Sequence, residues 1–422
     1  MGRPSLAWLL GRAVAVAACA PVPMAWAQPP MAPPPAVAPA VASLLQARVS
    51  CPALQRRLEA AVGAEASVWS VTVVDGRGQL LADVNGQRPR VPASNQKLIS
   101  TAFALDRLGP DHRLSTRLWL LPDGRLRLTG QGDPDLDLPR LQRIAQRALA
   151  QARGTTVRLE LAEVPASSWW PEGWNPADRS QHYGAPITRL AVTSNEVGVA
   201  VSNPPSRLQR LLASAASQQG GSVQLSLVSA SAPLPTGAQL IHEEPSVPML
   251  GLLGFANTDS HNFTAEVLLR EAAGTWDLQD ARRQATAWLS QQGVPMEGVR
   301  IADGSGLDRA NRLTSRALAA LLLRMDQHPQ ARLYADSMAI AGRRGTLRNL
   351  YVNTSLAGQF RGKTGTLTGV RSITGVLSTA DGPRYVSALS NGASAPNVTI
   401  GTILRSAQDP SLCSNLSASA GW

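Results

Sequence analysis

Ser94 and Lys97 are the first residues in the chain whose types and spacing could support a reaction. A serine hydroxyl is a poor nucleophile until a base removes its proton, and a neutral lysine amine three residues further along the same helical face could do so. Pro92 and Ala93 precede Ser94, which places the serine at the N-terminus of a predicted helix. Free backbone N–H groups there favour developing negative charge. The S-x-x-K pattern therefore suggests serine-based acyl transfer.

The scarcity of lysine strengthens this interpretation. The 422 residues include 40 Lys and Arg, yet only Lys97 and Lys363 are lysines. Arginine serves most surface roles of lysine, but it cannot be deprotonated. Compositional bias could also leave two lysines by chance. However, Lys363 lies in the segment RGKTGT at 361–366, so both lysines occur among small or polar residues rather than on charged faces. These surroundings favour a chemical role for both.

Two further groups of polar residues could complete a site. Ser260, His261 and Asn262 stand at the start of a predicted helix, where a hydroxyl could relay protons and an amide could bind a peptide. Ser260 could equally serve only as the helix N-cap. In the second group the lysine and threonines could hold a carboxylate, and the glycines would let a substrate backbone approach a strand edge. The residues of this group are Lys363, Thr364, Gly365 and Thr366.

The predicted elements suggest how these residues come together. Strand patterns open the chain, helical periodicity fills the middle, and strands return before a final helix near 395–407. A sheet built from both ends and flanked by helices explains this order. The strands are expected at 67–75, 79–84, 371–379 and 384–391, and the main helices at 52–62, 94–108, 247–272, 278–292 and 315–327.

The region from 110 to 244 differs in texture from the rest. Short strands are expected at 115–121 and 124–129, a helix at 138–153, and a strand-like stretch at 222–241. We therefore predict a catalytic domain made of 43–109 and 245–416, interrupted by an inserted, mostly-β domain at 110–244.

Composition excludes several classes of protein. Charged residues make up 16% and hydrophobic residues 44%, which suits a folded chain with a sizeable core. No uninterrupted apolar run reaches about 18 residues, so a polytopic membrane protein is excluded. The five histidines lack the spacing of a zinc site, and a G-x-S-x-G elbow is absent. The arginines behind the net charge of +11 are dispersed, which argues against nucleic-acid binding and suits an anionic cell envelope.

The N-terminus has the pattern of a secretory signal. Arg3 and Arg12 precede an apolar run, and an A-x-A sequence ends at Ala27. We expect cleavage before Gln28, a Pro/Ala-rich tether at 28–42, and export to the periplasm. Alternatively, the residues before Cys19 resemble a lipobox, which would make the protein a lipid-anchored one.

Cys51 and Cys413 remain after cleavage. An even number of cysteines in an exported chain favours one disulfide, which would join the two ends of the folded region, although two buried free thiols are the alternative.

Together and in this order, S-x-x-K, S-x-N and K-T-G form a known set. The chain resembles penicillin-binding proteins of the D-alanyl-D-alanine carboxypeptidase/endopeptidase type (low molecular mass, class C). The resemblance extends from about 50 to 405 and includes VPASNQKLIST, GQGDP at 130–134, YGAP at 183–186, DGSGL at 303–307 with Asn311, and GTL at 345–347. Two features depart from the family pattern. His261 replaces the usual Asp, and the short interval between Ser94 and Ser260 suggests that one of the family's two inserted domains is reduced or absent.

The resemblance implies a transpeptidase/β-lactamase-like α/β fold, an antiparallel sheet flanked by helices, and no cofactor or metal. It implies that Ser94 is the nucleophile, Lys97 the base, and Ser260 a proton relay. Asn262 would bind the peptide amide and position Lys97, and the K-T-G residues would hold the substrate carboxylate. The N–H groups of Ser94 and Thr366 would form the oxyanion hole. We expect burial to lower the pKa of Lys97 and expect Lys363 to stay charged.

Peptidoglycan peptides would be the substrates and β-lactams covalent inhibitors. A secreted β-lactamase, which shares the three motifs, and a non-catalytic peptidoglycan-binding module are the rival interpretations. The insertion argues against the first, and intact catalytic motifs argue against the second. Carboxypeptidase or endopeptidase preference, peripheral membrane association and oligomeric state are left open by the sequence.

Overall fold

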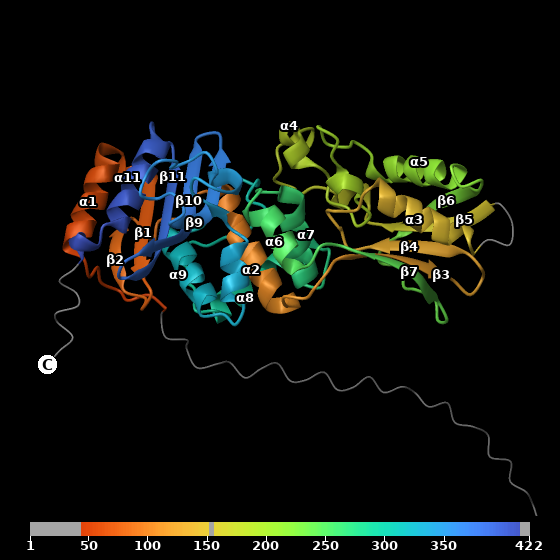
Figure 1. The fold of residues 1–422 in the computed structure, drawn as a ribbon, viewed down its shortest axis with the longest axis horizontal. Coiled ribbons are helices and arrows are strands. Elements are labelled where there is room, and N and C mark those ends of the chain that lie inside the picture. The colour runs from red at the N-terminus through yellow and green to blue at the C-terminus, as the bar shows by residue number, and fades with distance from the viewer. Residues whose placement is uncertain (1–43, 152–155, 414–422) are drawn as a thin grey trace, which may run out of the picture. The chain divides into compact units, whose positions relative to one another are not determined.

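The computed structural model describes residues 44–151 and 156–413. These described residues form one compact unit (Figure 1). The predicted signal peptide, the cleavage site before Gln28, the alternative lipidation site at Cys19 and the tether at 28–42 lie outside the described residues. Among the described residues, no helix combines the length and apolarity needed to cross a bilayer.

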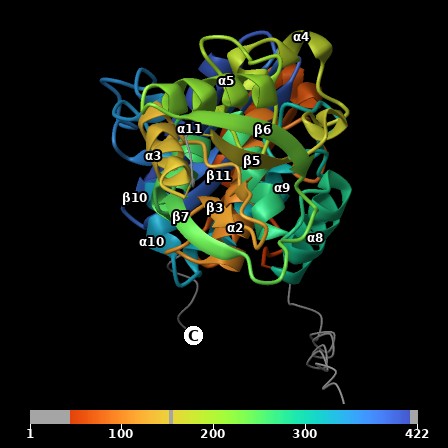
Figure 2. The same cartoon turned by 90° about the vertical axis from the view of Figure 1, so that its right-hand side faces the viewer.

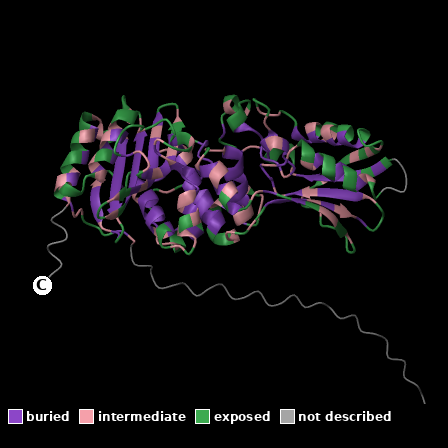
Figure 3. Ribbon diagram, viewed as in Figure 1, coloured by how far each residue is buried: buried purple, intermediate pink, exposed green. Residues whose placement is uncertain are grey.

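The central sheet is built from both ends of the chain, as the sequence predicts. Its six strands are antiparallel in the order β2-β1-β11-β10-β9-β8. Side chains of β1 alternate between two cores: Trp69, Val71 and Val73 face one and Val74 the other. Both faces of the sheet are therefore covered, and Figure 3 shows its strands largely buried. The bounds are β1 Trp69–Asp75, β2 Leu80–Val84, β8 Ala339–Ile340, β9 Phe360–Leu367, β10 Val370–Thr379 and β11 Gly382–Asn391.

Helices lie on both sides of this sheet (Figure 1). On one side, α1 (Pro52–Val62) buries Leu54 and Leu58 beside α11 (Pro396–Gln408). On the other side, a second core contains α2 and the helices packed around it. These helices are α2 Lys97–Leu108, α6 Met249–Asn257, α7 Asn262–Ala272, α8 Leu278–Gln291, α9 Ser315–Asp326 and α10 Ala331–Asp336.

The predicted helix at 247–272 is wrong in one respect that matters for the site. The segment forms two helices, α6 and α7, broken at 258–261. Ser260 lies in this break with φ 64°, a left-handed conformation that cannot continue a helix. The break directs the S-x-N residues into the space beside α2 instead of spreading them around one continuous helix.

A second sheet lies between β2 and α6 in sequence, with the order β6-β5-β4-β3-β7. The β3–β4 and β3–β7 pairs are antiparallel, whereas β4–β5 and β5–β6 are parallel. The strand-like stretch predicted at 222–241 contains β6 and the start of β7, which are the two edge strands of this sheet. Helices α3 and α5 cover one face of this sheet (Figures 1 and 2). The bounds are β3 Ser115–Leu120, β4 Leu126–Gly130, β5 Thr156–Glu163, β6 Ser222–Ser229, β7 Gln239–Pro245, α3 Leu138–Leu149, α4 Pro176–Arg179 and α5 Pro204–Ser217.

The second sheet lies almost entirely within residues 110–244, the region predicted to be an inserted domain. We call these residues the insertion; a separate domain with these limits remains a prediction. Helix α5 has no counterpart among the elements expected from the sequence.

Cys51 and Cys413 are joined by a disulfide, with their Cα atoms 5.4 Å apart. Cys51 immediately precedes α1 and Cys413 follows α11, so the bond joins the ends of two helices that pack on the same face of the central sheet.

Candidate active site

Ser94 lies in a single 3₁₀ turn, η2 (Ala93–Gln96), directly before α2. Ala93 has φ 47°, which bends the chain sharply before the serine. Gly306 packs against this bend, and a Cβ there would lie 1.9 Å from the carbonyl oxygen of Ala93. The turn is thus fixed by close backbone packing. The serine precedes the α-helix proper, where the sequence predicts that the helix begins at 94.

Lys97 is the first residue of α2 and its side chain is completely buried. Its Nζ lies 2.9 Å from Ser94 Oγ, 2.6 Å from Asn262 Oδ1 and 2.7 Å from the carbonyl oxygen of Ser305. The S-x-x-K and S-x-N residues therefore meet as the sequence predicts. The contact with Ser305 brings in a third segment to which the sequence analysis assigns no role.

Burial lowers the pKa of Lys97 to about 7, because the charged ammonium loses its hydration in the interior. The carboxylates of Asp303 and Glu266 act in the opposite direction and favour the ammonium. The net result is an amine whose neutral form is populated near neutral pH, as a general base requires.

The loop at 303–308 is held by these same two buried carboxylates. Glu266 accepts hydrogen bonds from the backbone N–H groups of Gly304 and Ser305 at 2.8 and 2.9 Å. Asp303 accepts from the N–H groups of Gly306 and Asp308, and from Trp174 Nε1 of the insertion at 2.8 Å. The loop is thereby fixed with the Ser305 carbonyl toward Lys97. The DGSGL resemblance marks this loop, but nothing in the sequence identifies Glu266 as its partner.

Ser260 is linked to the second lysine. Lys363 Nζ donates to Ser260 Oγ at 2.9 Å and to the carbonyl oxygen of Thr364 at 2.8 Å. Asn262 donates its amide N–H to the carbonyl oxygen of Tyr183 at 2.8 Å, while its Oδ1 accepts from Lys97. Asn262 therefore positions Lys97 as expected, and here its amide nitrogen is bonded to the insertion.

The K-T-G residues lie on β9, whose outer edge pairs with the short β8 only at Arg361 and Gly362. From Lys363 to Leu367 that edge has no partner strand among the described residues, which leaves it available to an extended peptide. Thr366 is exposed at this edge and Arg371 donates to its hydroxyl. Thr364 donates to Thr346 Oγ1 at 2.9 Å.

Gly365 serves a purpose other than the one expected. A Cβ at this position would lie 2.7 Å from the carbonyl oxygen of Pro92 and 2.1 Å from Ser372 Oγ. The glycine therefore lets β9 approach the segment that carries Ser94, rather than making room for a substrate.

Lys363 is completely buried, and its pKa is lowered well below the ordinary lysine value. Burial is the main cause, and the nearby charge of Lys97 adds to it, while Asp259 opposes both. The ammonium form of Lys363 is therefore destabilised like that of Lys97, whereas the sequence analysis expects a lowered pKa for Lys97 alone. The sequence could not show that both amines are desolvated in one place.

A cavity of about 700 Å³ opens over the nucleophile and is lined by Ser94, Ser260, Asn262 and Thr366. The sequence analysis missed several other residues that line it. Tyr183 and Asp178 come from the insertion and are hydrogen-bonded to each other at 2.9 Å. The remaining charged residues of the wall are Arg309 and Arg371. Tyr183 belongs to the YGAP stretch that the resemblance includes, but nothing in the sequence places it or the other three residues beside Ser94.

His261 lies beside the site. Burial lowers its pKa to about 4, with the charge of Lys97 as a further cause, so the ring is neutral near pH 7. Its Nδ1 lies 2.7 Å from Thr264 Oγ1. It makes no contact with the nucleophile. The cysteines lie outside the cavity wall.

Comparisons with known proteins agree with this geometry. Carboxypeptidase DacB of Mycolicibacterium smegmatis is 29% identical over 408 residues, which cover 87% of this chain and 86% of that protein. The D-alanyl-D-alanine carboxypeptidase of Actinomadura sp. is 27% identical over 431 residues, covering 79% of each. Among solved structures, penicillin-binding protein 4 of Haemophilus influenzae has a TM-score of 0.73 at 19% identity, covering 83% of this chain and 97% of that one.

The sequence also matches the D-Ala-D-Ala carboxypeptidase 3 (S13) family over residues 53–204 and 192–403. These ranges include the strands from both ends of the central sheet, the second sheet, and the segments that carry Ser94, Asn262 and Lys363. The expected fold is confirmed, and the chain belongs to the D-Ala-D-Ala carboxypeptidase 3 (S13) family, which makes it a serine-type D-Ala-D-Ala carboxypeptidase.

Proposed function

We propose that this carboxypeptidase acts in the periplasm on peptidoglycan stem peptides through an acyl-enzyme on Ser94, that it also cleaves peptide cross-links, and that penicillins acylate it. The observation that carries the proposal is the 2.9 Å distance between Ser94 Oγ and the buried amine of Lys97, whose pKa is about 7. An amine of this kind can accept the serine proton near neutral pH.

The hydrogen-bonding neighbours of Lys97 can accommodate the neutral, base form of the amine. A neutral amine has two N–H groups and one lone pair. Asn262 Oδ1 and the Ser305 carbonyl oxygen are both acceptors and can take the two N–H groups. The lone pair is then left for the hydroxyl of Ser94, the third close neighbour.

In the first half of the reaction, Ser94 Oγ attacks the carbonyl carbon between two D-alanines while Lys97 takes its proton. The N–H groups of Ser94 and Thr366 stabilise the oxyanion, a contribution of about 10²–10³ in rate for each such donor. Collapse of the intermediate breaks the peptide bond. Ser260, hydrogen-bonded to Lys363, passes a proton to the leaving amine.

In the second half, water attacks the Ser94 ester and releases the shortened stem peptide. The substrate is held as an added strand along the open edge of β9. Lys363, Thr364 and Thr366 bind its terminal carboxylate, and that negative charge favours the ammonium form of Lys363.

Relatives support this substrate and inhibitor class. Penicillin-binding protein 4 of Haemophilus influenzae has been solved in complex with a β-lactam. Bd3459 of Bdellovibrio bacteriovorus, with a TM-score of 0.53, is a peptidoglycan endopeptidase, and it has also been solved acylated by penicillin G. The signal-like N-terminus, from which the periplasmic location is proposed, supports access to such a substrate.

Intact-mass spectrometry after incubation with penicillin tests the nucleophile directly. We expect one added penicillin on the wild type and none on Ser94→Ala, with Ser290→Ala on the exposed surface of α8 as a labelled control. Labelling of Ser94→Ala would place the nucleophile elsewhere.

Two substrates separate the activities. The proposal expects D-alanine release from a stem pentapeptide and cleavage of a cross-linked peptide dimer, both lost in Ser94→Ala. Dimer left intact would limit the enzyme to carboxypeptidase activity. Rapid turnover of a chromogenic cephalosporin with no action on either peptide would instead support the β-lactamase alternative.

A further inference from the structure

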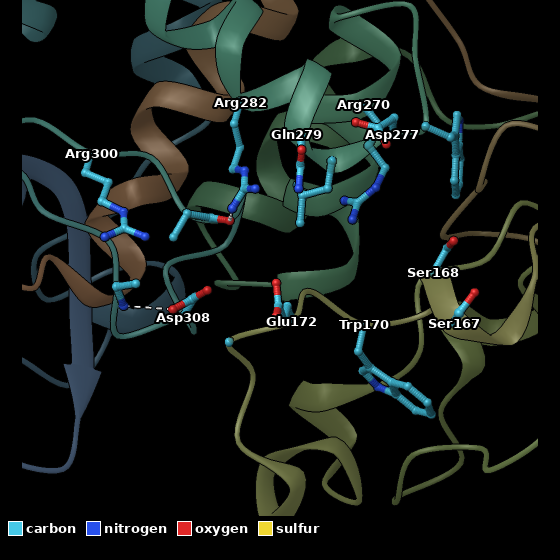
Figure 4. A pocket seen from close by; sticks show the side chains of 15 residues that line it. Ser167, Ser168, Trp170, Glu172, Arg270, Asp277, Gln279, Arg282, Arg300 and Asp308 are labelled. Atoms are coloured by element: carbon cyan, nitrogen blue, oxygen red, sulfur yellow. Dashed lines mark hydrogen bonds between the residues drawn. The ribbon is translucent and has the colours of Figure 1, made fainter.

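A second cavity, of about 480 Å³, lies next to the catalytic one and has no part in the mechanism above. Figure 4 shows Gln279 and Arg282 extending into it from one side and Glu172 and Asp308 from the opposite side. Its walls come from α7 and α8, from the insertion before α4, and from the loop that follows Arg300.

This cavity and the catalytic cavity share two walls. In the loop that carries the Lys97 contact, Gly306, Leu307 and Arg309 line the catalytic cavity, whereas Asp308 and Ala310 line the second one. The two cavities therefore lie on opposite sides of a single segment of chain.

The insertion divides the cavities in the same way. Glu172 and Gly173 line the second cavity, and Asn175 lines the catalytic one. Between them, the buried Trp174 donates its indole N–H to Asp303 at 2.8 Å and ties the two dividing segments together. A substrate larger than the catalytic cavity has this second cavity as its immediate neighbour.

The charges of the second cavity are close to balance. Three arginines and three carboxylates line it. Arg270 is paired at 2.7 Å with Glu266, which lies outside the wall, so the other two arginines face the three carboxylates. A strongly anionic or cationic ligand would leave uncompensated charge at such a site. An uncharged ligand that both donates and accepts hydrogen bonds would not. The charged lining residues are Arg270, Arg282, Arg300, Glu172, Asp277 and Asp308.

Much of the hydrogen-bonding capacity of the wall is unused. Arg300 and Gln279 make no side-chain hydrogen bond within the part of the chain that the structure describes. Arg282 uses one guanidinium N–H, toward the carbonyl oxygen of Ala302 at 3.1 Å, of the five it has.

Two indole rings complete the wall. The N–H of Trp170 is donated to the carbonyl oxygen of Gly184 at 2.9 Å, and that of Trp276 to Glu271 Oε1 at 2.6 Å. Arg179 lies over the Trp170 ring and Arg189 over the Trp276 ring, so the rings offer the cavity the apolar surface that these guanidinium groups leave uncovered. Apolar ring surface beside unpaired donors and acceptors suits a pyranose, which has C–H faces and a rim of hydroxyl groups.

We propose that this cavity binds a neutral saccharide, namely the amino-sugar portion of the glycan to which the stem peptide is attached. The inference rests on the proposed action on peptidoglycan. There the carboxyl group of the sugar is consumed in the amide bond to the peptide, so the sugar unit is uncharged. Helices and loops form the walls and offer no strand edge to a peptide backbone, which favours the saccharide over a second peptide.

A comparison of two substrates tests the proposal. The double variant Gln279→Ala/Arg300→Ala should lose about tenfold in kcat/KM on a disaccharide-pentapeptide, which corresponds to about 1.4 kcal/mol. It should match the wild type on the free pentapeptide. Arg56→Ala on α1, which replaces another exposed arginine without a side-chain hydrogen bond, should change neither value. Equal losses on both substrates, or no loss on either, would overturn the proposal.

Direct binding separates this inference from the proposed function. The neutral disaccharide N,N′-diacetylchitobiose should bind the wild type and Ser94→Ala alike in ligand-observed NMR, and its signal should be lost with the double variant. Absence of binding to the wild type would refute the saccharide site. If the wild type released no D-alanine from either substrate while the disaccharide still bound, the proposed function would fail and the saccharide site would stand.

Discussion

Lys97 and Lys363 both have a lowered pKa because both are buried at the same site. Both side chains are completely buried, and burial lowers both pKa values, with the charge of Lys97 contributing to the shift of Lys363. The motifs predict the meeting of these residues with Ser94 and Ser260. The pKa of Lys97 also depends on the opposing charges of Glu266 and Asp303, which no local pattern connects to the lysine.

The pH dependence of acylation follows from the pKa of Lys97. The reactive amine is the neutral one, so the rate constant for penicillin acylation should rise with pH, by about tenfold per unit below pH 7, and level off above it. Lys97→Arg should be as damaging as Lys97→Ala, a loss of about 10²–10⁴-fold, because arginine keeps a charge it cannot give up. Stopped-flow acylation between pH 5 and about pH 9 measures this, and a flat profile would exclude Lys97 as the base.

The electrostatic coupling between Lys97 and Lys363 can be measured without overlapping lysine signals, because the chain has no other lysine. In Lys97→Met the neighbouring positive charge is gone, so the pKa of Lys363 should rise toward the ordinary value of about 10.4. The ¹³Cε shift of the remaining lysine, followed as a function of pH in selectively labelled protein, reports it. An unchanged pKa would mean that burial alone sets the value.

At the scale of elements, β9 and η2 depend on close backbone contact. The sequence predicts that both exist, but it cannot show that Gly365 packs against Pro92, because this contact joins segments at opposite ends of the chain. The break between α6 and α7 could be predicted only in part. The S-x-N residues suggest that a helix starts there, but apolar periodicity continues through 247–272, and the left-handed conformation of Ser260 in the break is visible only in the structure.

Gly365→Ala should separate β9 from the nucleophile, because the added Cβ would meet Pro92 O and Ser372 Oγ. We expect a loss of about 1–3 kcal/mol in unfolding free energy and a marked fall in acylation rate. Gly254→Ala in α6 is the matched control, since a Cβ there meets nothing within 4 Å. It should leave acylation unchanged and stabilise the helix by about 0.5–1 kcal/mol. Urea unfolding measures the stability of each variant, and the rate of penicillin acylation measures its activity. If Gly365→Ala and Gly254→Ala had the same stability and the same acylation rate, the packing argument would be contradicted.

At the scale of the whole molecule, the order of strands and helices predicts the sheet built from both ends and the region that interrupts it. The contribution of that region to the site is not predictable in this way. Trp174 holds the loop at 303–308, and Tyr183 accepts the amide of Asn262. These contacts depend on how the region of the second sheet packs against the rest of the protein. The sequence pattern predicts strands, but it does not predict this packing.

The bond between Cys51 and Cys413 should stabilise the protein without affecting the reaction. It closes a loop with a sequence separation of 362 residues, for which the chain-entropy model gives about 6 kcal/mol. Thiol titration of the unreduced, denatured protein should find no free thiol among these two cysteines. Cys51→Ser/Cys413→Ser should unfold at lower denaturant concentration and still be acylated by penicillin. An unchanged midpoint would show that the bond adds nothing to stability.

The pairing of β1 with β11 sets an order of folding during synthesis. Val71 pairs with Ala388, so the first strand of the central sheet must wait for almost the whole chain before its partner exists. The second sheet lies wholly between Ser115 and Pro245, and its contacts are available much earlier. Distant contacts close slowly because the entropy of a long loop must be lost first. The site on the central sheet is therefore completed late, after the last strands have emerged, so a truncated or unfinished chain carries no assembled site.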